Sequence, residues 1–144
     1  MPQPASPETG QPLSPDSRLG RKLEKALTPF LDKSRITCVQ AHELAARFAV
    51  APLTVGQTLD RLGIKIRQCQ LGLFGHDPKS RIVPEGIHVP PRLEEAIRSR
   101  QRNDRLSCLE AWHLADEFGL SRLEICGACE KLSIRISQCQ LGAF

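Results

Sequence analysis

The chain contains an internal duplication with an offset of seventy residues and no gaps. The heptapeptides QCQLGLF at 68–74 and QCQLGAF at 138–144 are its most similar part. Between residues 35–74 and 105–144, sixteen of forty positions are identical. Because a repeat of this length is one supersecondary unit copied twice, the fold has to be built from two similar units. We therefore define repeat 1 as residues 18–74 and repeat 2 as residues 88–144.

The other residues do not have the composition of a folded domain. Residues 1–17 contain five prolines beside Ser, Gln and Gly, which predicts a disordered Pro/Ser-rich tail. Residues 75–87 contain Pro78, Pro84 and two glycines, which predicts a linker. No apolar run approaches the length of a membrane span, and no signal-peptide pattern opens the chain. We therefore expect a cytoplasmic protein without membrane association.

The two repeats differ in formal charge. Repeat 1 has ten Lys and Arg against four Asp and Glu, whereas repeat 2 has eight of each. An excess of six positive charges in a small domain favours a polyanionic partner. We therefore expect repeat 1, rather than repeat 2, to contact such a partner.

Helical spacing of apolar residues dominates both repeats. Amphipathic stretches at 21–31 and 92–102 predict first helices. Thr37 with Gln40, and Ser107 with Glu110, have the spacing of capping boxes and predict the starts of second helices. Residues 64–67 alternate apolar and basic side chains, which predicts a strand. This strand is expected to pair with residues 35–37 or with its own counterpart in the other repeat.

The segments AVAPLTVGQTLDRLGI and GLSRLEICGACEKLSI, which follow Phe48 and Phe118, resemble the helix-turn-helix of bacterial repressors. Ala45 and Ala115 are the small residues that face the partner helix, and Ala49 and Gly119 lie at the turn. The resemblance implies a mostly α protein with short β-strands and two tandem winged-helix-like repeats. It also implies a DNA-binding transcription regulator that uses the helix-turn-helix of repeat 1, with double-stranded DNA as the partner.

A DNA-binding role assigns functions to the exposed side of repeat 1. Gln and Thr side chains at the start of the second helix can contact base edges, and Arg and Lys can contact bases or phosphates. The alternative interpretation is a basic face that only interacts with solvent. The predicted DNA-binding residues are Arg35, Arg47, Thr54, Gln57, Thr58, Arg61, Lys65 and Arg67.

Repeat 2 is less suited to bind DNA. Glu124 stands where repeat 1 has Thr54, and its carboxylate would repel phosphate. Small residues such as Gly127 and Ala128 would let another chain approach closely, which favours a protein partner or self-association through repeat 2. The second functional hypothesis is therefore a non-catalytic protein-interaction module built on the same fold.

The cysteines allow a third hypothesis, a metal- or redox-sensing regulator. Cys126 and Cys129 form a CxxC pair that Cys108 and Cys139 would have to complete, because zinc needs four ligands. Repeat 1 has counterparts of Cys108 and Cys139 but no CxxC, which favours structural cysteines that are reduced. We therefore expect no metal and no cofactor. No combination of nucleophile, base and orienting group has a recognisable spacing, so an enzyme is not expected.

The heptapeptide itself changes its apolar face. Ile64, Ile66 and Gln68 share one strand parity, whereas Cys69 and Leu71 share the other. This predicts a bulge or a strand buried on both sides. The first hypothesis is that the motif is a structural seam, where the two copies lie side by side and their glutamines pair. The second hypothesis is a contact with a ligand or partner.

Overall fold

In the computed structural model the chain is described from residue 17 onwards, so the predicted tail lies outside the described residues except for Ser17. The chain divides into two compact units that do not coincide with the two repeats. Among the described residues, unit 1 consists of residues 17–68 together with Gln140–Ala143, and unit 2 consists of Cys69–Cys139 with Phe144. Most of each heptapeptide therefore belongs to the unit that is otherwise built from the other repeat.

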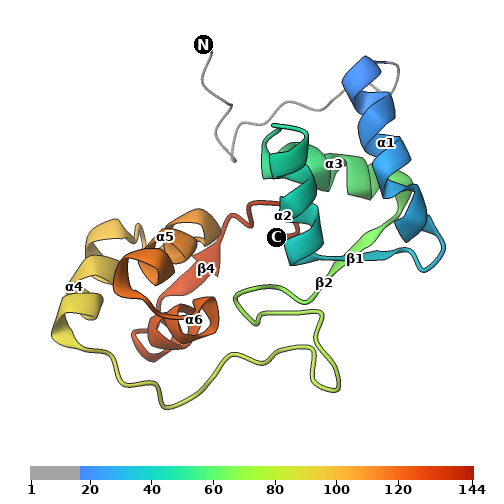
Figure 1. Cartoon of the computed structure of the whole chain (residues 1–144). Coiled ribbons are helices and arrows are strands. Elements are labelled where there is room, and N and C mark those ends of the chain that lie inside the picture. The colour runs from blue at the N-terminus through green and yellow to red at the C-terminus, as the bar shows by residue number, and fades with distance from the viewer. Residues whose placement is uncertain (1–16) are drawn as a thin grey trace, which may run out of the picture. The chain divides into compact units, whose positions relative to one another are not determined.

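Unit 1 contains three helices and two short strands within its described residues (Figure 1). In chain order they are α1 (Arg18–Leu31), β1 (Arg35–Thr37), α2 (Cys38–Arg47), α3 (Pro52–Leu62) and β2 (Lys65–Arg67). β1 and β2 run parallel, with Arg35 opposite Lys65 and Thr37 opposite Arg67. The predicted strand is thus present, and its partner is residues 35–37 rather than its own counterpart.

Unit 2 repeats this order of elements (Figure 1). They are α4 (Pro91–Arg100), β3 (Arg105–Ser107), α5 (Cys108–Phe118), α6 (Arg122–Lys131) and β4 (Arg135–Ser137). β3 and β4 are also parallel, with Arg105 opposite Arg135. The prediction of a mostly α protein with short strands is confirmed.

Hydrogen bonds to side chains fix where the second and third helices begin. Thr37 and Gln40 form the predicted capping box of α2, with both reciprocal bonds present. In α5 only the Ser107 hydroxyl accepts a bond, from the Glu110 amide, so the second predicted capping box is incomplete. A complete box that the sequence analysis missed joins Ser121 and Glu124 at the start of α6. Glu124 therefore has a structural role.

Each unit has an apolar core between its helices. Val55 and Leu59 of α3, and Ile125 and Cys129 of α6, are fully buried. The core of unit 2 also contains Cys69 and Leu71 of the first heptapeptide. The core of unit 1 comprises Leu23, Leu27, Ile36, Cys38, Ala41, Leu44, Ala45, Ala51, Val55, Leu59, Ile64 and, from the second heptapeptide, Leu141.

The heptapeptide is a turn, and the prediction of a bulge or a doubly buried strand is wrong. Each strand ends before it, because Gln68 and Gln138 have left-handed φ angles of 53° and 51°. In the first copy the Gly72 amide donates to the Cys69 carbonyl over 3.0 Å, and the Cys69 amide donates to the Phe74 carbonyl over 3.1 Å. Reversal of the chain, rather than a change of strand face, explains the shift in apolar parity.

The predicted linker, residues 75–87, is part of unit 2 and packs against its core. The Ile82 amide donates to the Gly72 carbonyl over 2.7 Å, and the side chains of Val83 and Ile87 lie half-buried against the core. Lys131 donates to the Ile87 carbonyl over 2.9 Å, and Arg81 forms an ion pair with Glu130. Among residues 17–144, no helix is long and apolar enough to cross a membrane.

Candidate nucleic-acid interface and heptapeptide docking sites

The two threonines predicted to contact bases are buried. Thr54 and Thr58 each expose only 4% of their surface. The Thr58 hydroxyl donates to the Thr54 carbonyl, one helical turn earlier, over 3.0 Å. Neither side chain reaches a surface where a base edge could contact it in this conformation.

The other two predicted positions on α3 are an ion-paired arginine and a half-buried glutamine. The Arg61 guanidinium forms an ion pair with Glu24 of α1. Gln57 is half-buried, and its Oε1 is enclosed without a hydrogen-bond partner among the described residues. Since a buried carbonyl without a partner costs about 1–3 kcal/mol, the environment of Gln57 is unfavourable. The α3 helix therefore exposes few of the side chains that were predicted to contact bases.

The β1–β2 ladder carries one pair of exposed basic residues of unit 1. Arg35 and Lys65 are opposite each other and exposed. The side chain between them on β1, Ile36, is buried, so it points to the other face, and the basic pair faces solvent. Arg67 lies opposite Thr37 on the solvent side and is half-buried.

This ladder places two like charges side by side. Like charges directly opposite each other destabilise a strand pair. Among residues 17–144, neither Arg35 nor Lys65 forms an ion pair that would offset the repulsion. Arg47 at the end of α2 is exposed as well, and its guanidinium lies 5.4 Å from the Phe48 ring centre. Further exposed basic residues of unit 1 are Arg18, Arg21, Lys22, Lys25 and Lys33.

Unit 2 has the same ladder in a more neutral setting. Arg105 and Arg135 are opposite each other and exposed. Ion pairs neutralise the arginines of α4, because Arg98 lies 2.9 Å from Glu94, and Arg100 lies 2.7 Å from Glu117. A polar groove of about 770 Å³ borders this ladder. Its lining comprises Ser99, Arg100, Gln101, Arg102, Arg105, Ser107, Glu110, Ser137 and Gln138.

The second heptapeptide docks on α3 through its backbone as well as through the buried side chain of Leu141. A Cβ added at Gly56 would overlap the Leu141 carbonyl oxygen and lie 2.7 Å from its carbonyl carbon. Next along the segment, Gly142 has a φ of 77°, and a Cβ there would lie 2.7 Å from a Leu53 methyl. Gln140 and Leu141 are both buried. The segment Gln140–Ala143 therefore fits a notch that exists because residue 56 has no side chain.

The first heptapeptide docks on α6 in a related way. Leu71 is fully buried. A Cβ added at Gly72 would lie 2.4 Å from a Leu123 methyl, just as a Cβ added at Gly142 would lie 2.7 Å from a Leu53 methyl. The counterpart of Gly56 is Cys126, which is buried in the core beside this loop. At Gly127 an added Cβ would lie 2.8 Å from the Pro84 carbonyl oxygen. Close approach through small residues, predicted for repeat 2, thus occurs within the chain.

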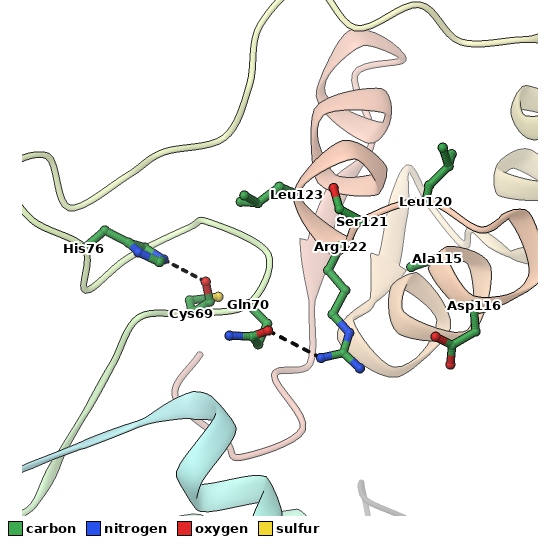
Figure 2. Close-up of a pocket in the computed structure, with 9 residues that line it drawn as sticks. All are labelled: Cys69, Gln70, His76, Ala115, Asp116, Leu120, Ser121, Arg122 and Leu123. Atoms are coloured by element: carbon green, nitrogen blue, oxygen red, sulfur yellow. Dashed lines mark hydrogen bonds between the residues drawn. The ribbon is translucent and has the colours of Figure 1, made fainter.

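A pocket of about 380 Å³ lies where the first heptapeptide meets the start of α6 (Figure 2). Figure 2 shows Arg122 extending towards Gln70, whose Oε1 is 3.5 Å from the guanidinium. The guanidinium also stacks 3.5 Å from the centre of the Trp112 ring. On the loop side, His76 Nε2 is 2.8 Å from the Cys69 carbonyl. These contacts hold the loop against the helix.

The CxxC pair of α6 is part of the core. Burial raises the pKa of the Cys126 thiol to about 12, although the nearby Arg81 opposes this, and burial likewise raises the pKa of Cys129 to about 12. Both thiols therefore lose their proton less readily than an exposed cysteine does. Within residues 17–144, no group of three or more His, Cys, Asp or Glu is placed to hold a metal ion. The described structure therefore does not bring three of Cys108, Cys126, Cys129 and Cys139 together as a ligand group.

Sequence reasoning missed the docking role of Leu141 and its neighbours. The repeated heptapeptide was a signal of importance, and a glycine inside the helical pattern at residue 56 was a signal of close backbone approach. No family model, curated protein or solved structure matches the chain.

Proposed function

We propose that the protein binds double-stranded DNA through unit 1, as a transcription regulator built from two tandem helix-turn-helix units of winged-helix type. The observation that carries the proposal is the exposed pair Arg35 and Lys65 on the β1–β2 ladder, without an acidic partner among the described residues. A phosphate that lies between the two side chains would turn their mutual repulsion into attraction. The formal charge of +6 on repeat 1 supports the same partner.

The contacts that we propose are to the DNA backbone. Phosphate contacts supply most of the affinity of such complexes, and they need exposed cations rather than a helix in the major groove. The burial of Thr54 and Thr58 and the pairing of Arg61 leave α3 poorly placed for base recognition. We therefore infer binding with a weak sequence preference in this conformation.

Fluorescence anisotropy with a short labelled duplex tests the proposal. The dissociation constant should rise steeply with salt, because each neutralised phosphate releases counterions. The affinity should depend little on the sequence of the duplex. Absence of binding at low salt would reject the proposal.

A second candidate is a protein-interaction module that does not bind nucleic acid. It is favoured by the covering of both third helices, α3 by Gln140–Ala143 and α6 by the first heptapeptide and the linker. A helix face that accepts a short segment of its own chain can recognise a segment of another chain in the same way. The same anisotropy experiment separates the two candidates, because this one predicts no DNA binding at any salt concentration.

A further inference from the structure

The face of α3 on which Gln140–Ala143 docks is an interaction surface whose occupant is part of the same chain. Leu141 exposes 2% of its surface, its carbonyl fills the notch at Gly56, and Gly142 lies against Leu53. The related contacts of Leu71 and Gly72 with unit 2 show that this turn binds the third helix of a unit twice in one molecule. The recognition is therefore a property of the turn and the helix.

The segment is joined to the rest of unit 1 only through unit 2. The chain leaves unit 1 after Gln68 and returns at Gln140, so the notch and its occupant are separated by the whole of residues 69–139. The return follows Gln138, a non-glycine residue with a left-handed φ of 51°. Such a residue is a suitable hinge, because its conformation is strained and its alternatives lower the backbone energy.

We propose that the notch on α3 also accepts the segment Gln140–Ala143 of a second copy of this chain. The exchange keeps every contact of the docked segment, because donor and acceptor are the same in sequence. Exchange of an identical element between protomers is a low-cost route to dimers. Within one chain the segment competes at an effective concentration of the order of millimolar, so the intrachain form dominates at ordinary concentrations. The proposal is independent of DNA binding.

Two complementary variants remove the intrachain competition. Gly56→Leu blocks the notch and leaves an intact segment without a site. Leu141→Asp disables the segment and leaves an intact notch empty. In an equimolar mixture, the segment of the first variant can dock only on α3 of the second, so we expect a species of two chains by size exclusion with light scattering. Neither variant should form it alone.

Nuclear magnetic resonance locates the contact. With the Leu141→Asp chain labelled with ¹⁵N, the amides of α3 should shift when the unlabelled Gly56→Leu chain is added. A synthetic peptide with the sequence SQCQLGAF should reverse the association, whereas the same peptide with Asp in place of its Leu should not. The matched control is Asp60→Leu, a substitution at an exposed position of α3. When this variant is mixed with the Leu141→Asp chain, no two-chain species should form, because its own segment still occupies its own notch.

The outcomes decide the proposal. A two-chain species that dissociates when the peptide is added supports the proposal. A mixture that stays monomeric, or a complex in which the α3 amides do not shift, overturns it. If either variant is unfolded by circular dichroism, the milder pair Gly56→Ala and Leu141→Ser replaces it, and absence of a complex from that pair overturns the proposal equally.

Discussion

The carbonyl group of Leu141 occupies the space that a side chain at residue 56 would need, so Gly56 and Leu141 fit only as a glycine and a docked backbone. Glycine inside a helix costs about 1 kcal/mol relative to alanine, because it loses more backbone entropy on folding. The chain bears this cost at the place where a second segment has to approach α3 closely. The tertiary contact therefore outweighs helix propensity at this position.

Gly56→Ala tests this balance. Alanine should stabilise an isolated α3 by about 1 kcal/mol, yet we expect the protein to become less stable, because the segment Gln140–Ala143 has to move away. Chemical denaturation gives the change in unfolding free energy, and hydrogen exchange should show faster exchange at residues 140–143. Asp60→Ala, on the exposed side of α3, should change neither. A more stable Gly56→Ala protein would contradict the docking.

Leu71→Ala and Leu141→Ala test which unit each heptapeptide completes. Both leucines are fully buried or nearly so, and truncation of a buried leucine typically costs about 2–5 kcal/mol. We expect Leu141→Ala to speed hydrogen exchange in α2 and α3, and Leu71→Ala to speed it in α5 and α6. Each variant is the control for the other. The opposite pattern, in which each substitution speeds hydrogen exchange in the helices of its own repeat, would refute the division into units.

Local structure was predictable from the sequence, because its causes are local. The capping pair Thr37 and Gln40 and the apolar spacing of Val55 and Leu59 depend only on neighbours within a helical turn. The burial of Thr54 and Thr58 could also have been predicted from the sequence. Each directly precedes a core residue, so it lies about 100° around α3 from that residue, at the border of the buried face.

Docking of the heptapeptide was not predictable in this way. The sequence marks Leu141 as one of a repeated set, but its partner Gly56 lies in the other repeat, and no local rule connects them. The ion pair of Arg61 with Glu24 has the same character, because it joins two helices far apart in sequence. The chemistry of such residues can be read from the sequence, whereas the ion pair that engages Arg61 depends on a contact between distant segments.

The capping box of Ser121 and Glu124 at the start of α6 can be tested directly, because it gives Glu124 a structural role. Its side chain accepts from the Ser121 amide over 3.2 Å, and its own amide donates to the Ser121 hydroxyl over 3.1 Å. Ser121→Ala should therefore lower the unfolding free energy by about 1 kcal/mol, the usual cost of a lost N-cap. Glu124→Ala should have a smaller effect of the same sign. Thermal denaturation of both variants is sufficient, and unchanged midpoints would argue against the capping box.

The buried thiols predict how stability depends on alkaline pH. The pKa values of Cys126 and Cys129 rise from an ordinary 9.0 to about 12 in the folded protein, chiefly through burial. Between these values the folded state binds more protons than the unfolded state, so stability is complete below pH 9 and falls as the pH rises towards 12. The slope should reach about 1.4 kcal/mol per pH unit for each thiol. A Cys126→Ala/Cys129→Ala variant should lose this part of the slope in denaturation curves, and equal slopes would contradict it.

The two ladders allow a matched test of DNA binding within one molecule. Arg35 and Lys65 in unit 1, and Arg105 and Arg135 in unit 2, occupy equivalent positions on parallel strand pairs, and all four are exposed. Their surroundings differ, because ion pairs with acidic residues neutralise Arg98 and Arg100 of unit 2, whereas α1 of unit 1 exposes several basic residues. Loss of charge should therefore matter more in unit 1.

We expect the double variant Arg35→Ala/Lys65→Ala to weaken DNA binding for every duplex sequence alike. If each side chain neutralises one phosphate, the slope of log affinity against log salt should become shallower by about two. The double variant Arg105→Ala/Arg135→Ala removes the same number of charges from the equivalent ladder, and it should leave the slope nearly unchanged. Equal losses from both variants would instead indicate attraction by total charge, and a change only in the second would transfer the binding surface to unit 2.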